Sequence, residues 1–434
     1  MTAVSGNIEN ILLKVIIQLI VIIAAARISG AAFRRLGQPV VCGEIAAGLI
    51  LGPSLLGRFF PGIFRTVFDP SVGQIFSIFS QVGLVLLMFL IGLEFDFGHL
   101  SENRSTALSV SLVGIVLPFG LGFALGKAMH EQLGLSGSWV NFSLFMATAM
   151  SITAIPILGR IMIELNLNRT RIGSLTISAA AVDDASGWII LALVTAIVRS
   201  TFDPIKMTIM VGGVIAYGLA MALAVRPLVY RAFEAVLRKN GGNLTLDSLA
   251  VLLILMLLSA AATNLIGIFS IFGGFMFGAI LYDQQELREA VNRRLQDFVT
   301  VFFLPIFFTY TGLRTDIGSM AGGGLWIFCG LVLLAAVVGK FGGCTLAARD
   351  NGLPLREASI IGVMMNTRAL MELIVINIGY DLGIIPKTVF FMLVVMAVVT
   401  TYMTTPILRR LMRHSEVWES YRVSAFAARF EMKG

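Results

Sequence analysis

Long apolar runs constrain this chain more than any other feature. Stretches of about 20 mostly apolar residues, the length that a helix needs to cross about 30 Å of hydrocarbon, follow one another from Ile8 to Met412. Of the 434 residues, 57% are hydrophobic and only 13% are charged, whereas about 25% are charged in an ordinary soluble domain. These properties exclude a soluble globule. The sequence therefore predicts an all-α polytopic membrane protein whose helices contact the lipid bilayer.

Polar clusters, glycines and prolines divide the apolar runs into about 13 candidate transmembrane helices. The division around Asn264 and Gly267 has the weakest support, and the count without it is 12. We expect one transmembrane domain over 1–413 and a short cytoplasmic tail over 414–434. The expected spans lie near 9–33, 39–57, 72–95, 105–129, 139–161, 170–199, 206–231, 245–266, 268–283, 296–313, 323–348, 355–379 and 386–411.

The basic residues orient this topology. With an external N-terminus, the loops assigned to the cytoplasm hold 18 Lys and Arg residues and the external side holds 8. Such residues concentrate in cytoplasmic loops, so the bias predicts an external N-terminus and a cytoplasmic C-terminus, in a bacterial inner membrane. It also explains the net charge of +7 without a nucleic-acid partner. The three cysteines are isolated in apolar segments, which predicts neither a disulfide framework nor a metal site formed by them.

Of the few charged side chains at bilayer depth, where an ionisable group is costly and marks a functional site, three form the first candidate group. Asp183 and Asp184 are adjacent in the sixth span, and Lys340 lies in the middle of the eleventh. Successive residues of a helix diverge by about 100°, so one acid can pair with the lysine while the other faces a cavity. A purely structural ion pair is the alternative. Because adjacent carboxylates repel each other, we favour a site for a cation or a proton.

The fifth span also carries polar residues at mid-membrane. Ser151 and Thr153 precede Pro156 there. Proline removes a backbone hydrogen bond and disfavours helical geometry in the residue before it. The sequence therefore predicts that this helix breaks near Ile155.

The twelfth span carries a second polar cluster, formed by Asn366, Thr367 and Arg368. It has no proline, so two structures fit: a second break, or a continuous helix in which Arg368 pairs with Glu372 one turn later. Seven spans separate the fifth from the twelfth, an odd number, and the two therefore cross the membrane in opposite directions. Oppositely directed broken helices are typical of inverted repeats, whose breaks meet at the midplane around a substrate.

Short motifs follow one another over nearly the whole chain. They are, in order, Leu36-Gly37-Gln38-Pro39, Gly43-Glu44, Gly48–Ser54, Ser151–Ala154, Asp183-Asp184, Phe307–Arg314, Gly339-Lys340, Asn366-Thr367-Arg368 and Glu372–Val375. Taken together, these motifs resemble the monovalent cation:proton antiporter-2 family. The resemblance implies a homodimer with two crossed, unwound helices. It also implies a mobile core domain, here the helices at about 105–199 and 323–411, and dimerisation helices in the remainder.

The resemblance also implies residue roles. Asp184 is the principal carboxylate for cation and proton, and Asp183 is the acid paired with the charge-compensating Lys340. Thr153, with Ser151 beside it, belongs to the ion site at the first crossing. The metal ion at the two acids is Na⁺ or K⁺. The residues of the second crossing are Asn366, Thr367 and Arg368.

The expected function is exchange of a monovalent cation for protons by alternating access, without a cofactor or enzymatic activity. The adjacent acids resemble the Na⁺/H⁺ branch, which makes Na⁺ the preferred cation, whereas the fifth and twelfth spans also resemble plant exchangers linked to K⁺. A sodium-coupled organic-anion symporter of similar architecture is a further alternative. An intramembrane aspartyl protease is disfavoured, because its two acids must share a proton from different helices.

Overall fold

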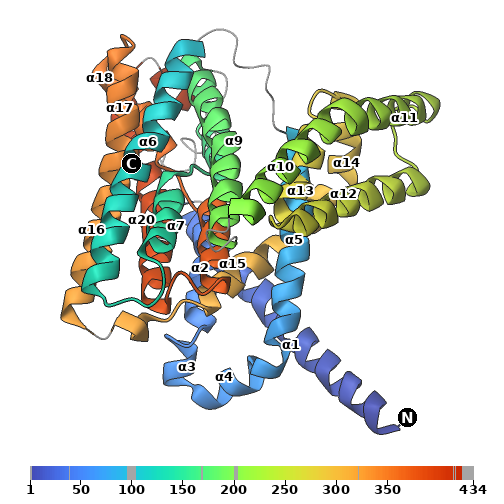
Figure 1. Cartoon of the computed structure of the whole chain (residues 1–434). Helices are drawn as coiled ribbons and strands as arrows, with labels where there is room; N and C mark the ends of the chain where they lie inside the picture. The colour runs from blue at the N-terminus through green and yellow to red at the C-terminus, as the bar shows by residue number, and fades with distance from the viewer. Residues whose placement is uncertain are drawn as a thin grey trace. The chain divides into compact units, whose positions relative to one another are not determined.

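The computed structural model describes residues 2–38, 40–94, 104–167, 170–199, 204–320, 322–413, 415 and 417–422. Every regular element in these ranges is a helix (Figure 1). Ten helices there are long and apolar enough to cross a membrane, and a bent pair raises the number to eleven. The predicted fold class, an all-α polytopic membrane protein, is thereby confirmed.

The expected count of about 13 exceeds eleven because two expected spans contain only short helices. The fifth divides into α7 (Trp139–Ser151) and α8 (Ile155–Glu164), and the ninth is α13 (Ser270–Ala279). The uncertain division between the eighth and ninth spans exists. The helix α12 (Leu246–Ile266) is followed by Gly267, whose φ of 104° is the left-handed conformation that commonly terminates a helix.

Contacts between residues divide the chain into two compact units. Unit 1 comprises Met1–Ala25, Phe60–Phe97 and Ala192–Tyr310, and unit 2 comprises Ala26–Phe59, Gly98–Leu191 and Thr311–Gly434. Three helices continue from one unit into the other: α1 (Thr2–Arg35), α9 (Arg171–Arg199) and α15 (Leu304–Leu313). The helices expected to form the core domain belong to unit 2 as far as Leu191.

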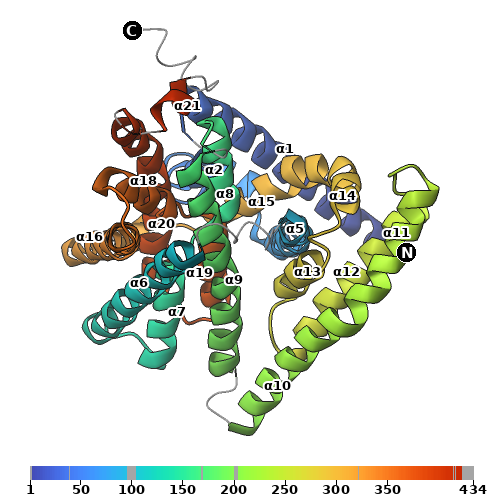
Figure 2. The same cartoon turned by 90° about the horizontal axis from the view of Figure 1, so that it is seen from above.

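Unit 1 is held together by close approaches between helix backbones. Its central helix, α5 (Gly73–Glu94), packs against α13, and α13 packs against α12 (Figure 2). A Cβ atom added to Gly92 would lie 2.2 Å from the carbonyl oxygen of Phe275, so only glycine permits this contact. The remaining elements of this unit are α4 (Pro61–Val67), η1 (Pro70–Val72), α10 (Pro204–Ala220), η3 (Met221–Val225), α11 (Arg226–Lys239), α14 (Gln285–Phe298) and η4 (Val299–Phe303).

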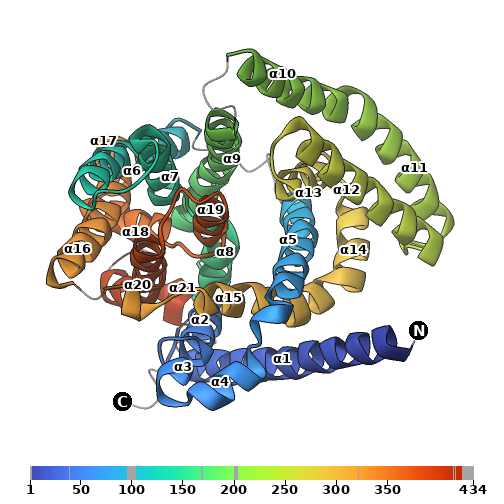
Figure 3. The ribbon, with the colours of Figure 1, turned by 60° about the horizontal axis from the view of Figure 1, so that its bottom comes forward.

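Unit 2 contains a nearly completely buried helix, α19 (Leu370–Asp381). This helix packs against α7 and α20 (Lys387–Met412) (Figure 3). Around them, α6 (Arg104–Gln132) packs against α7 and α17 (Gly343–Asp350). The remaining elements are α2 (Val40–Leu51), α3 (Leu56–Phe59), η5 (Ile317–Met320), α16 (Gly323–Val337), η6 (Val338–Gly342), α18 (Leu355–Met365) and α21 (Trp418–Arg422).

Candidate functional site

The fifth span is broken in the middle of unit 2. The helix α7 ends at Ser151, residues 152–154 are not helical, and α8 begins at Ile155. Ile152 is extended, with φ −84° and ψ 144°. Pro156 stands in the first turn of α8, where the missing N–H of proline has no helical partner to lose. The predicted break is confirmed, just before the expected residue.

The twelfth span is broken as well, although it has no proline. The helices α18 and α19 are separated by residues 366–369 and bend by 42°. Ala369 has a φ of 121°, one of two positive values among the described non-glycine residues. The hydroxyl of Thr401 on α20 accepts the N–H of Arg368 over 3.2 Å and donates to its carbonyl over 2.8 Å. The alternative of a continuous helix is therefore wrong.

The two breaks cross each other. The Thr153 hydroxyl donates to the Met365 carbonyl over 3.1 Å, and the N–H of Ala154 donates to the Thr367 carbonyl over 3.2 Å. These bonds satisfy backbone carbonyls that leave the helical pattern at the end of α18. The structure thus brings together Thr153 and Thr367, residues of two spans that the sequence placed at the same depth.

Asp183, on α9, forms an ion pair with Lys340 on η6. The Lys340 Nζ lies 2.8 Å from Oδ1 and 2.9 Å from Oδ2 of Asp183. The same carboxylate accepts the N–H of Thr153 over 2.9 Å, and Lys340 also donates to the Ser151 carbonyl. All of these side chains are buried. A buried ion pair is tolerated only when further hydrogen bonds satisfy it, and the first crossing supplies them.

Asp184 faces a different environment from its neighbour. Its side chain is fully buried, and within the described part of the chain neither carboxylate oxygen makes a hydrogen bond of normal geometry. The uncharged Trp188 side chain, about one turn later on α9, is the polar group that acts on it besides Asp183 and Lys340. A buried ionised carboxylate without a partner is very costly. This side chain therefore needs either a proton or a cation. Asn366, at the second crossing, presents another buried oxygen, Oδ1, without a hydrogen bond in the same ranges.

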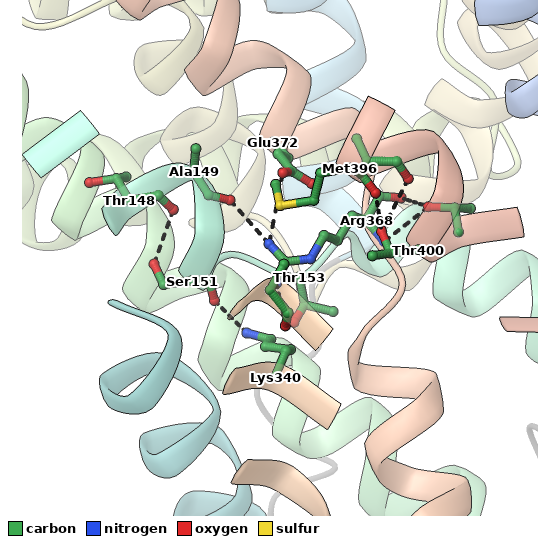
Figure 4. A network of polar contacts seen from close by, with 12 residues as sticks. Thr148, Ala149, Ser151, Thr153, Lys340, Arg368, Glu372, Met396 and Thr400 are labelled. Atoms are coloured by element: carbon green, nitrogen blue, oxygen red, sulfur yellow. Dashed lines mark hydrogen bonds and ion pairs between the residues drawn. The ribbon is translucent and has the colours of Figure 1, made fainter. Parts of the chain in front are cut away.

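Arg368 extends from the second break to two other helices. Its Nη1 donates to the Ala149 carbonyl and its Nη2 to the Ala336 carbonyl, both over 3.3 Å. The Glu372 carboxylate lies 3.8 Å from Nη1. Figure 4 shows the Arg368 side chain between Ala149 and Glu372, with Lys340 directed at Ser151. Two positively charged side chains, Arg368 and Lys340, therefore contact the C-terminal end of α7, where carbonyl groups without helical partners give a partial negative charge.

The threonines of α20 are the contributors that sequence reasoning missed. Besides the Thr401 contacts, the hydroxyls of Thr404 and Thr367 lie 3.5 Å apart, and Thr404 also donates to the Thr400 carbonyl over 2.9 Å. The signal was present as four threonines within six residues of a largely apolar span: Thr400, Thr401, Thr404 and Thr405. Threonines at this spacing share one side of a helix, which here faces the second break.

Comparisons with known proteins agree with this architecture. The family model described as sodium/hydrogen exchanger, transmembrane, matches residues 20–414. The Na⁺/H⁺ antiporter NhaS4 of Synechocystis sp. is 39% identical over 408 residues, covering 93% of this chain and 98% of that protein. Cation/H⁺ antiporter 17 of Arabidopsis thaliana is 35% identical over 92% of this chain, which spans 48% of that longer protein.

A solved structure shows the same fold. The sodium proton antiporter MjNhaP1 from Methanocaldococcus jannaschii matches with a TM-score of 0.62 at 15% identity, covering 96% of this chain and 99% of that one. Together with the family match over residues 20–414, these similarities identify the chain as a member of the sodium/hydrogen exchanger transmembrane family.

Proposed function

We propose that this protein exchanges Na⁺ for protons across a membrane, and that Asp184 is the group for which the two compete. The observation that carries the proposal is the fully buried Asp184 carboxylate, which makes no hydrogen bond of normal geometry within the described ranges and has the uncharged Trp188 side chain beside it. Membership of the exchanger family and the Na⁺/H⁺ antiporter relative support the choice of substrates. The protein is a transporter driven by ion gradients and not an enzyme.

Competition follows from the electrostatics of the site. In a medium of low dielectric constant, a lone carboxylate holds one positive charge at a time. A proton neutralises it covalently, and a dehydrated Na⁺ neutralises it together with nearby oxygen atoms. Because the two exclude each other at Asp184, movement of one ion across the membrane requires return of the other.

Asp183 and Lys340 modulate that competition in this proposal. Their ion pair places the Lys340 ammonium group on Asp183, the residue that precedes Asp184 in the chain. When a cation binds, Asp183 can turn from Lys340 towards it, and the ammonium group can then release a proton. The hydroxyl and carbonyl groups of Ser151, Thr153, Asn366 and Thr367 are oxygen donors of the kind that alkali cations accept. Their positions at the two breaks support a site at the crossing.

Alternating access provides the transport step. We assign the moving part to the helices at about 105–199 and 323–411, as the inverted-repeat architecture suggests, and dimerisation of two copies to the remaining helices, as the family resemblance implies. The excess of basic residues in the assigned cytoplasmic loops supports an external N-terminus and a cytoplasmic C-terminus in a bacterial inner membrane. No cofactor is required, since the gradients of the two ions drive exchange.

The test is exchange in everted vesicles or proteoliposomes loaded with a pH-sensitive dye. Addition of Na⁺ should dequench the dye with the normal protein and not with Asp184→Asn. The control is Asp283→Asn, which removes a partly exposed carboxylate paired with Arg226 in unit 1. Normal exchange by Asp184→Asn would refute the proposal. Faster dequenching with K⁺ than with Na⁺ selects the K⁺/H⁺ alternative, and Na⁺ uptake that needs an organic anion selects the symporter.

A further inference from the structure

We propose that Glu372 is a positioning residue for Arg368, and that its negative charge sets the affinity of the ion site for the transported cation. This inference rests on the proposed competition at Asp184. It concerns a second buried charge pair, on the α19 side of the crossing, which the exchange step described above does not use.

The surroundings of Glu372 are unusual for a carboxylate. It lies in the first turn of α19 and is fully buried. Among the described residues, neither oxygen makes a hydrogen bond, and the one ion pair is with Arg368, over 3.8 Å. The side chain thus acts on Arg368 by charge at a distance longer than a hydrogen bond. A buried carboxylate without hydrogen bonds destabilises the fold, so packing does not explain its presence here.

Arg368 links Glu372 to the first crossing, because its guanidinium group contacts both. Its guanidinium donates to the Ala149 carbonyl, and Lys340 donates to the Ser151 carbonyl, two residues further along α7. The two cations therefore meet the same end of α7, directly before the unwound residues that contact Asp183. Loss of the negative charge beside Arg368 would therefore change the electrostatic potential at this end of α7.

Within the described ranges, the charged side chain that pairs with Glu372 is Arg368. Of the helices packed against α19, α7 has no ionisable residue, and α20 has Lys387, Arg409 and Arg410 near its ends and an exposed Tyr402. The local electrostatics thus depend on a small set of groups: the cations Lys340 and Arg368, and the carboxylates Asp183, Asp184 and Glu372.

The charges of this set give Glu372 its role. With all five groups ionised, the sum is one negative charge, which a single monovalent cation or proton neutralises. Without the charge of Glu372, the empty site sums to zero and the loaded site to one positive charge. An uncompensated buried charge is unfavourable. Loss of Glu372 should therefore weaken binding of the cation and of the proton alike.

The experiment is Glu372→Gln, assayed for exchange as a function of Na⁺ concentration and pH. A unit charge acting through an effective dielectric constant of about 20 changes a binding constant about tenfold at a separation of about 12 Å. At alkaline pH, where protons do not compete, we therefore expect the KM for Na⁺ to rise roughly tenfold. The maximal rate at saturating Na⁺ should change little. The half-maximal point of the pH profile should move to lower pH by about one unit, because protons bind less tightly too. A merely structural role would not move that profile.

Two controls separate charge from shape. Glu289→Gln makes the same change in an i,i+4 pair with Arg293 that is about half exposed, and it should leave both KM and profile unchanged. Glu372→Asp keeps the charge and should keep a KM near that of the normal protein. A normal KM and pH profile in folded Glu372→Gln, or a tenfold rise in KM in Glu372→Asp, would overturn the inference. Asp184→Asn in the same vesicles tests the competition separately.

Discussion

The backbone N–H of Ala154 donates to the carbonyl oxygen of Thr367 over 3.2 Å, which joins two unwound segments more than 200 residues apart in the chain. The bond matters because both groups would otherwise be unpaired at the centre of a membrane, where no water replaces them. With the Thr153 hydroxyl on the Met365 carbonyl, it sets how closely the two breaks approach. Each break therefore stabilises the other, and a substitution at one break should alter the structure of both.

Removal of the Thr153 hydroxyl should weaken this junction. In Thr153→Val, the Met365 carbonyl loses its donor, at a cost of about 1–3 kcal/mol for a buried group left unpaired. We expect a lower melting temperature in detergent and a higher KM for Na⁺. The matched control is Thr176→Val, because the buried Thr176 hydroxyl donates within its own helix, to the Ile172 carbonyl. Equal effects of the two substitutions would argue against a special role of the crossing.

Lys340 should matter more for stability and pH dependence than for exchange itself. Lys340→Ala leaves the Asp183 carboxylate buried with the Thr153 N–H as its remaining hydrogen-bond partner among the described residues. Breaking a buried ion pair in this way costs about 3–5 kcal/mol. We expect a reduced melting temperature, residual exchange with a shifted pH profile, and an altered current on a solid-supported membrane. Asp183→Asn added to Lys340→Ala removes the stranded charge and should recover part of the stability; no recovery would contradict the charge-based explanation.

The ion pair of Lys14 with Asp69, a carboxylate that lies between two candidate spans, gives a stability prediction with a defined pH window. The Lys14 side chain and the Ser71 N–H bind Asp69 over 2.7 Å and 2.9 Å, and they lower the pKa of Asp69 from its ordinary 3.8 to about 2. A carboxylate with a lowered pKa stabilises the fold above its unfolded pKa, and that contribution is lost as pH falls through the folded value. Asp69→Asn should therefore be slightly less stable at pH 5 to 7, a range above both values.

The same pair is exposed enough for salt to test it. Thermal unfolding of Asp69→Asn and of the normal protein should differ at pH 6 in low salt and converge in about 1 M salt, where the screening length falls to about 3 Å. Lys14→Met should behave like Asp69→Asn. A difference that is independent of salt would assign the effect to packing instead of charge.

Sequence reasoning reached the parts of this site that depend on local patterns. The apolar runs gave the helices, Pro156 indicated the first break, and charge at bilayer depth singled out Asp183, Asp184 and Lys340. The parts it missed depend on contacts between distant segments. The second break is held by Thr401 from another helix, and nothing near residues 366–369 reveals that partner. Likewise, the destinations of the Arg368 guanidinium on Ala149 and Ala336 follow from packing alone.

Two glycines on α6 offer a paired test of how packing around α7 reaches the crossing. A Cβ atom added to Gly122 would lie 2.8 Å from the Ala147 Cα, whereas one added to Gly120 meets nothing within 4 Å. Gly122→Ala must therefore push α7 away, at about 1–3 kcal/mol, and α7 ends at the first break four residues after Ala147. We expect a lower melting temperature and slower exchange. Gly120→Ala should be neutral or stabilising by about 0.5–1 kcal/mol, because alanine favours a helix. If Gly122→Ala left both stability and exchange intact, α7 would be free to shift without disturbing the site, and the rigid crossing described above would be wrong.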